Sequence, residues 1–248
     1  MNNTKNNQNG FSLVELAMVL FIVSLMIGGL LVPLATSVEQ AEREDTQRQL
    51  DDVKEALYAF GVVNGRLPCP DCTSTSVTGC GSVTPNDGVE DQTASSPFLD
   101  CASLFGNLPW TTLGVDENDA WGQHFTYRVT QAFAYEVANT TAVTAPCNDS
   151  ADAAFDLCTP GDIDVSETED DGTPTVADNV AAIAISHGMD YSEPTHSALQ
   201  LDNTDTDFTF VKKDFSRDYS GGTDFDDLMI WISPSILKNN LVNAGKLP

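Results

Sequence analysis

The sequence is poor in basic residues. Its 248 residues include 11 Lys and Arg against 37 Asp and Glu, which gives a formal net charge of -26 at pH 7. Proteins bind nucleic acids through Lys and Arg that neutralise phosphates, so we do not expect a nucleic acid as a partner. Anionic lipid surfaces also repel such a chain. The excess of acids favours solubility.

The sequence also lacks the short motifs of common enzyme sites. It contains no Gly-x-Ser-x-Gly, no phosphate-cradling loop and no His-Glu-x-x-His. Of the three histidines, His124, His187 and His196, one follows a serine directly, Ser186, and adjacent residues of a strand point to opposite faces. We therefore expect neither catalysis nor a cofactor.

One long apolar segment stands near the start of the chain. The 22 residues from Phe11 to Val32 contain one ionisable side chain, Glu15. As a helix, this segment is long enough to cross the hydrocarbon core of a bilayer, which is about 30 Å thick. A carboxylate near the middle of a bilayer costs roughly 2.5 to 3.5 kcal/mol, so Glu15 is a candidate functional residue. Alternatively, Glu15 near the helix start reaches the headgroups and favours the helix dipole.

A polar leader precedes the apolar segment. Residues 1–9 are almost all Asn, Gln and Thr, with one base, Lys5. A secretory signal is the alternative, but its apolar core usually has only about 7 to 15 residues. Lys5 before the span and several acids after it favour an N-terminus in the cytoplasm. The rest of the chain then lies outside the inner membrane.

The motif Gly10-Phe11-Ser12-Leu13-Val14-Glu15-Leu16 resembles the N-terminus of type IV pilins and of the pseudopilins of type II secretion. In that family the leader ends in Gly, Phe usually follows, and Glu is the fifth residue of the mature chain. The resemblance implies that a prepilin peptidase cuts between Gly10 and Phe11 and methylates the new amine. It further implies that Glu15 pairs with the amine of Phe11 in a neighbouring subunit. Such head-to-tail pairing does not close on itself, so it propagates as a filament.

The helix is expected to continue beyond the membrane segment. Pro33, which follows Gly28 and Gly29, predicts a bend or a melted turn, although small residues also allow close helix packing. From Ser37 to about Phe60, apolar residues recur at spacings of three and four, which predicts an amphipathic helix. We therefore expect a leader at 1–10, a helix at 11–62 (11–32 transmembrane, 37–60 amphipathic) and a β-rich head at 63–248.

Six cysteines lie in the expected head. An even number outside the cytoplasm favours disulfides, although the Cys-x-x-Cys at 69–72 also suggests a zinc site or a redox pair. No second Cys-x-x-Cys completes a zinc-ribbon spacing. Among the 15 possible connectivities, our prediction is Cys69 with Cys101, Cys72 with Cys80, and Cys147 with Cys158.

Strand patterns place the head in the β class. Alternating or apolar runs predict strands at 124–130, 179–186, 208–212 and 227–232. Thr73 to Ser96 is expected to be a long loop. The acid-rich stretch from Asp162 to Asp178 is expected to be a solvated loop. Calcium is a weaker alternative there, with the candidate ligands Asp162, Asp164, Asp170 and Asp171, because the EF-hand spacing is absent.

The sequence therefore predicts an α+β subunit of pilin-like fold, with a long N-terminal helix packed on a mainly antiparallel head. The expected function is structural, in a type IV pilus or a type II secretion pseudopilus, with prepilin peptidase, other pilin or pseudopilin subunits and inner-membrane lipid as partners. The head has about 185 residues, which suggests a minor subunit. The alternative is a membrane-anchored periplasmic binding module that does not polymerise.

Overall fold

A computed structural model of the chain describes residues 12–95, 98–134, 155–168, 176–189, 191, 197–216 and 224–247, with the backbone alone at 28–36, 94–95, 98–99 and 198. The chain divides into two compact units, Met1–Arg43 and Glu44–Pro248. Helix α1 (Leu13–Asn64) begins in the first unit and ends in the second. Helices and mainly antiparallel sheets make the fold α+β, as the sequence predicts.

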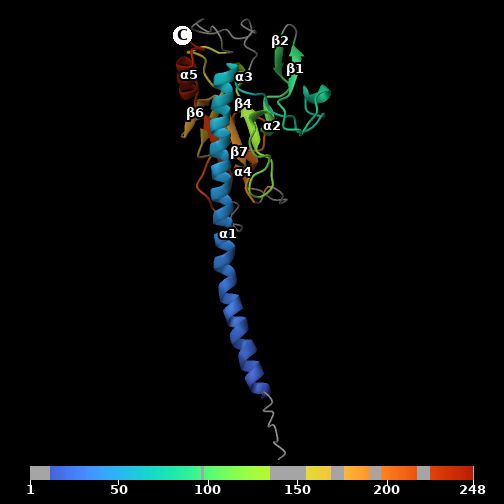
Figure 1. The fold of residues 1–248 in the computed structure, drawn as a ribbon, viewed down its shortest axis with the longest axis vertical. Helices are drawn as coiled ribbons and strands as arrows, with labels where there is room; N and C mark the ends of the chain where they lie inside the picture. Colours follow the sequence, from blue (N-terminus) through green and yellow to red (C-terminus); the bar gives the residue numbers. More distant parts are fainter. Residues whose placement is uncertain are drawn as a thin grey trace, which may run out of the picture. The chain divides into compact units, whose positions relative to one another are not determined.

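The second unit contains all the other elements (Figure 1). The helices are η1 (Cys80–Ser82), α2 (Trp110–Leu113), α3 (Gln131–Ala134), α4 (Ala198–Asp202) and α5 (Pro234–Asn243). The strands are β1 (Gln92–Ser95), β2 (Phe98–Cys101), β3 (Phe105–Asn107), β4 (Thr126–Val129), β5 (Ile163–Ser166), β6 (Ala177–Val180), β7 (Ala182–Ser186), β8 (Thr209–Val211) and β9 (Leu228–Ile232).

A four-stranded antiparallel sheet is the centre of this unit, in the order β3-β4-β7-β9. All five residues of β7 are buried because both faces of the sheet are covered. Ala182 and Ala184 belong to the core on one face, whereas Ile183 and Ile185 belong to the core on the other. This explains why the segment is a continuous apolar run in the sequence, as in other strands buried on both sides.

Helix α1 covers the first face of the central sheet. Its Leu50, Val53 and Leu57 are almost fully buried, at the spacing that predicts an amphipathic helix. The same core contains Leu237 and Leu241 of α5. At Gly61 a Cβ atom would lie 2.8 Å from Cδ1 of Leu237, so the absence of a side chain allows α5 to approach α1 closely.

The second face is covered by a three-stranded sheet in the order β6-β5-β8, in which β5 runs antiparallel to β6 and parallel to β8. Its Ile163, Val165 and Phe210 pack with Ile183 and Ile185 of the central sheet. The expectation of a solvated loop at 162–178 is therefore wrong at β5. Ile163 and Val165 alternate with Asp162 and Asp164, and the high acid content of the stretch hid this two-residue period.

Other boundaries also differ from the expectations. Helix α1 continues without interruption through Pro33, so there is no melted turn, and it ends at Asn64 before Gly65 in the left-handed region. The run predicted as one strand at 179–186 divides at Ala181 into the end of β6 and the whole of β7, and Asn179 within β6 has a φ of 53°. The loop predicted at 73–96 ends in β1, and α5 was not predicted.

Substitution of Leu57 by Ala should lower the free energy of unfolding by about 2 to 5 kcal/mol, because it leaves a cavity between α1 and the central sheet. Chemical denaturation monitored by Trp fluorescence measures the change. The matched control is Val63→Ala on the same helix, where the side chain is 71% exposed. That variant should differ from wild type by less than about 0.5 kcal/mol, and an equal loss in both variants would contradict the packing of α1.

Candidate functional site

Glu15 lies in the first turn of α1, where its side chain is exposed. Its Oε2 accepts a hydrogen bond from the backbone N–H of Ser12 at 3.0 Å. The Ser12 hydroxyl oxygen in turn accepts one from the N–H of Val14 at 3.2 Å. Ser12 and Glu15 thus stabilise the helix start together, in the manner of a capping box. The Ser-x-x-Glu spacing is visible in the sequence and is itself a signal of such a cap.

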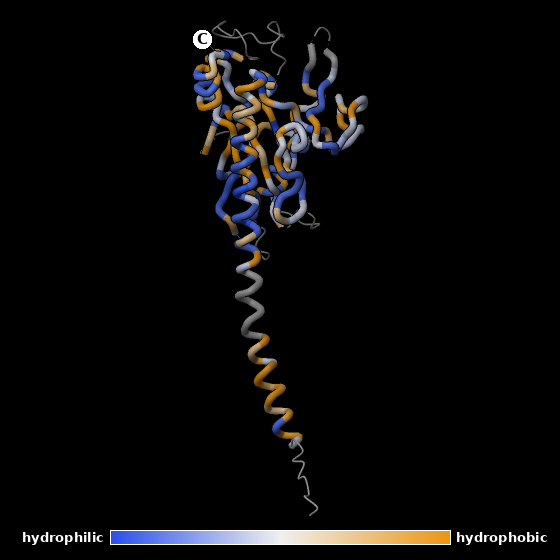
Figure 2. The backbone as a smooth tube through the Cα atoms, viewed as in Figure 1, coloured by the Kyte–Doolittle hydropathy of each residue, from blue (hydrophilic) through white to orange (hydrophobic). Residues whose placement is uncertain are grey.

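The helix that follows is apolar on all sides. Large apolar side chains at residues 13–27 are exposed, from 43% at Val23 to 85% at Leu13. Figure 2 shows this part of α1 as hydrophobic. The described part of the chain has no helix whose length and apolar character suffice to cross a membrane, so the span predicted at 11–32 is not confirmed.

Two other predicted positions of this segment lie outside the described residues. These are Gly10 and Phe11, the predicted cleavage and methylation site. At Pro33 the structure describes the helical backbone only. The structure therefore gives the geometry of Glu15, and the roles of Gly10, Phe11 and Pro33 remain predictions.

The structure contains the predicted disulfides Cys69–Cys101 and Cys72–Cys80. Cys158 is also disulfide-bonded, but Cys147 lies outside the described residues, so their pairing stays a prediction. An ion pair lies next to the first disulfide: both Nη atoms of Arg66 donate to the Glu90 carboxylate at 2.7 Å. Glu90 also accepts from the N–H of Cys69, and this joins the residues after α1 to the cysteine-rich loop.

Asp71, between Cys69 and Cys72, is a buried carboxylate that no motif in the sequence indicates. Its two oxygens accept hydrogen bonds from the N–H groups of Asn86 and Gly88, each at 2.9 Å. Burial raises the pKa of Asp71 to about 6, and the nearby Asp91 and Asp87 also raise it, while the two N–H groups lower it. Burial likewise raises the pKa of Asp91, whose carboxylate accepts from the N–H of Cys72.

Ser186 and His187 have separate partners. The Ser186 hydroxyl donates to Asp119 at 2.6 Å, and Asp119 also accepts from the N–H groups of Trp121 and Gln123 in the turn before β4. Ser186 is therefore a structural contact of that turn rather than a nucleophile paired with His187.

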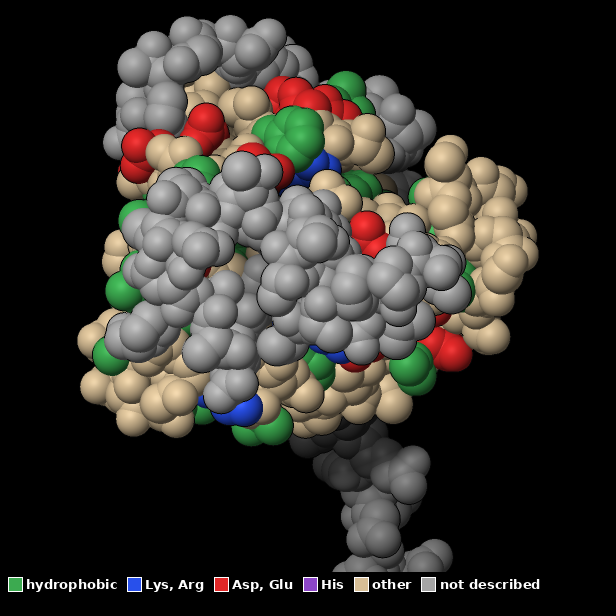
Figure 3. Space-filling model, turned by 90° about the horizontal axis from the view of Figure 1, so that it is seen from above, with side chains coloured by type: hydrophobic (Ala, Val, Ile, Leu, Met, Phe, Trp, Pro, Cys, Tyr) green, Lys and Arg blue, Asp and Glu red, His purple; other side chains and the backbone are tan. Residues whose placement is uncertain are grey.

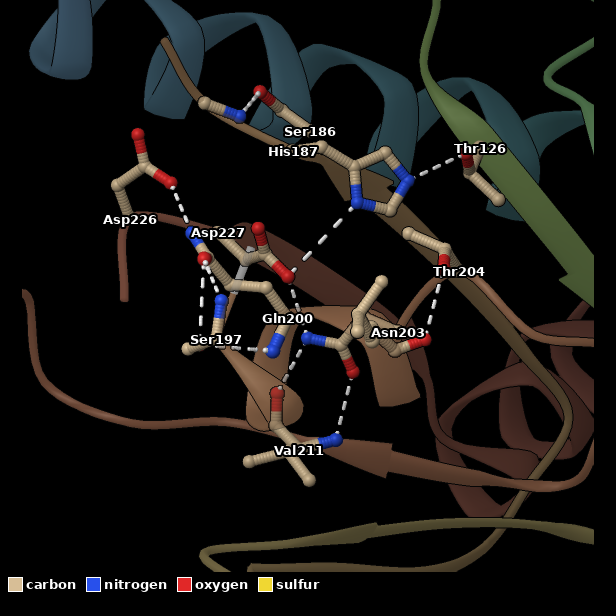
Figure 4. Close-up of polar contacts among 12 residues, drawn as sticks. Thr126, Ser186, His187, Ser197, Gln200, Asn203, Thr204, Val211, Asp226 and Asp227 are labelled. Atoms are coloured by element: carbon tan, nitrogen blue, oxygen red, sulfur yellow. Dashed lines mark hydrogen bonds and ion pairs between the residues drawn. The ribbon is translucent and has the colours of Figure 1, made fainter. Parts of the chain in front are cut away.

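His187 is buried between Thr126 and Asp227 (Figure 4). Its Nε2 lies 2.8 Å from the Thr126 hydroxyl, and its Nδ1 lies 3.9 Å from Asp227 Oδ2. The same Asp227 oxygen accepts from Asn203 at 2.6 Å. Asn203 also bonds both backbone groups of Val211 at the outer edge of β8. This network joins both sheets to α4, which indicates a structural role. Of the three histidines of the sequence, His196 lies outside the described residues.

The two candidate calcium ligands that the structure describes have separate hydrogen-bond partners. Asp162 accepts from the Thr130 hydroxyl at 2.6 Å, and Asp164 accepts from the N–H of Asn179 at 2.9 Å. Asp170 and Asp171 lie outside the described residues. Among the residues that are described, no group of three or more His, Cys, Asp or Glu side chains has an arrangement that could hold a metal ion.

Comparison with known proteins identifies the N-terminal segment. Residues 5–31 match the family model of the prokaryotic N-terminal methylation motif. The chain therefore carries the prepilin-type cleavage and methylation signature of type IV pilins and pseudopilins. Neither the curated proteins nor the solved structures that were compared gave a match. The signature supports a type IV pilin-like or pseudopilin subunit in general terms.

The stability contribution of Asp71 should depend on pH. Its pKa is about 6 in the folded chain and near the ordinary value of 3.8 when unfolded, so the folded state retains a proton that the unfolded chain loses between these values. The contribution is present below pH 3.8 and is lost as the pH rises through about 6. Urea unfolding at several pH values, compared with Asp71→Asn, measures it. If the difference in the free energy of unfolding between wild type and Asp71→Asn is the same at pH 4 and pH 7, the raised pKa of Asp71 is wrong.

Proposed function

We propose that this chain is a minor subunit of a type IV pilus or a type II secretion pseudopilus. A prepilin peptidase cuts it between Gly10 and Phe11 and methylates Phe11. Before assembly, residues 11–32 anchor it in the inner membrane in a single pass, with the N-terminus in the cytoplasm and the head, residues 63–248, in the periplasm. It then enters a periplasmic or cell-surface filament with other pilin or pseudopilin subunits.

The position of Glu15 is the observation that carries this proposal. It is the fifth residue after Gly10, inside the matched motif at residues 5–31, and in the first turn of an apolar helix. Cleavage creates a positively charged amine at the end of that helix. An ammonium group in an apolar environment is tolerated only with a hydrogen-bonded partner of opposite charge.

The geometry of Glu15 is compatible with such a partner. The carboxylate is exposed, and one described hydrogen bond, from the N–H of Ser12, is made by Oε2. An ionised carboxylate has about four acceptor positions on its two oxygens. Glu15 can therefore cap its own helix and also accept a charge-assisted hydrogen bond from the amine of Phe11 in a neighbouring subunit.

Processing is tested by the intact mass and the N-terminal residue of the protein isolated from membranes of cells that contain a prepilin peptidase. We expect a chain that begins at N-methylated Phe11, since the motif at 5–31 is the signature of that reaction. Cells without the peptidase are the control and should yield the uncut chain. A chain that begins at Met1 in both cells would leave a plain signal-anchor protein, and one that begins near Ser37 would indicate a secretory signal.

Assembly is tested by Glu15→Val, which removes the carboxylate and keeps the segment apolar. We expect at least a tenfold loss of the protein from sheared filaments, with cleavage at Gly10 unchanged. Ser12→Ala is the matched control, because it removes the hydrogen bond to Val14 and leaves the charge of Glu15. This control should assemble almost as well as wild type. Normal assembly of Glu15→Val would contradict the role of Glu15, whereas absence of the wild-type protein from filaments would favour the anchored binding module that does not polymerise.

A further inference from the structure

A groove lies beside α1 in the second unit, between the helix and the segment that follows α2. Its volume is about 510 Å³. Val53 of α1 and Phe125, both almost fully buried, form its apolar floor. Leu113 and Val115, which are half-buried, line the opposite side. We call this hollow the α1 groove.

The α1 groove is held open by specific contacts. Gln49 of α1 lines it, and the Gln49 side-chain nitrogen donates to Asp116 at 3.4 Å and to the backbone oxygen of Asn118 at 3.3 Å. Just before Asp116, α2 ends at Leu113, and its C-cap Gly114 lies in the left-handed region with a φ of 72°. These contacts fix the segment 113–118 against the helix, so the groove is formed before any ligand binds.

All the charged side chains that line the α1 groove are acidic. They are Asp52 and Glu55 of α1 and Asp116 of the opposite segment, and all three are exposed. A ligand with a long aliphatic stem and a cationic end fits this arrangement, because the stem covers the apolar floor and the cation meets the carboxylates. Lys and Arg side chains have this chemistry.

A second copy of this chain is a poor source of that side chain. The full sequence has a formal net charge of -26 with only 11 basic residues, and one of these, Lys5, is lost with the leader. Figure 3 shows one face of the molecule on which Asp and Glu side chains are spread among few Lys and Arg side chains. Contact between two such surfaces is unfavourable over a Debye length of about 8 Å at physiological salt.

We propose that the α1 groove binds a Lys- or Arg-bearing segment of a neighbouring filament subunit that is not a copy of this chain. This inference rests on the proposed function, because it requires that the chain enters a filament. The inference adds a second contact to the proposed function. Helix α1 brings the subunit into the assembly, and the α1 groove selects a neighbour with a basic segment. Opposite charges across an interface act chiefly on the choice of partner and on the rate of association.

The test reverses the charge of the groove rim in the full-length protein with the double variant Asp52→Lys and Glu55→Lys. The matched control is Glu44→Lys with Asp51→Lys, which makes the same change in charge at exposed positions of α1 outside the groove. We expect at least a tenfold loss of the groove variant from sheared filaments and less than a twofold loss of the control. Cleavage after Gly10 should be equal in all three proteins.

Zero-length carbodiimide cross-linking of purified wild-type filaments identifies the neighbour. We expect Asp52, Glu55 or Asp116 to be joined to a lysine of a different subunit, and this product to be absent from the groove variant. A cross-link to a lysine of the same protein, or equal incorporation of both double variants, would overturn the inference while the proposed function stands. If the wild-type protein never enters filaments, both fail together.

Discussion

The packing of α1 on the central sheet is the contact on which the rest of the second unit depends. Leu50, Val53 and Leu57 fill the space above β4, β7 and β9, and α5 packs into the same core through Leu237. The same helix also begins with the exposed apolar residues 13–27 and the carboxylate of Glu15. Substitutions at one end of α1 therefore affect the stability of the second unit, and substitutions at the other end change the exposed apolar segment, although both lie in one secondary-structure element.

The sequence predicted those parts of the fold that depend on local periodicity. The buried stripe of α1 and the strands β4, β7, β8 and β9 follow from spacings of three and four residues or of two. The disulfides Cys69–Cys101 and Cys72–Cys80 are also as predicted. Of the candidate site, the sequence predicted the motif around Glu15, because the family signature is contained within a few consecutive residues.

The features that the sequence did not predict depend on contacts between distant residues. Strand β5 pairs with β8, and the paired residues Asp164 and Thr209 are 45 positions apart in the sequence. The composition of β5 itself is that of a loop. The side chain of Asn203 bonds both backbone groups of Val211 at the edge of β8, as a neighbouring strand would. Nothing near Asn203 in the sequence indicates this role. The α1 groove is likewise formed by residues from α1 and from the segment after α2, so neither stretch alone indicates it.

The shortage of bases also explains how this protein buries its acids. Within the described part of the chain, no basic side chain is bonded to Asp71 or Asp91, and their oxygens accept hydrogen bonds from backbone N–H groups instead. Glu90, which pairs with Arg66, accepts from a backbone N–H as well. These hydrogen bonds and the two disulfides join the cysteine-rich loop to the rest of the second unit despite its polar composition.

The same shortage of bases bears on assembly. In the proposed filament the pairing of an amine with Glu15 would be neutral overall, but each added copy would bring the acid excess of a chain with 37 Asp and Glu against 11 Lys and Arg. Repulsion between adjacent heads therefore opposes long runs of identical subunits, and neighbours of lower or opposite charge relieve it. If the chain assembles as proposed, its strongly acidic second unit is thus better suited to a subunit present in few copies among others than to the main subunit of a filament.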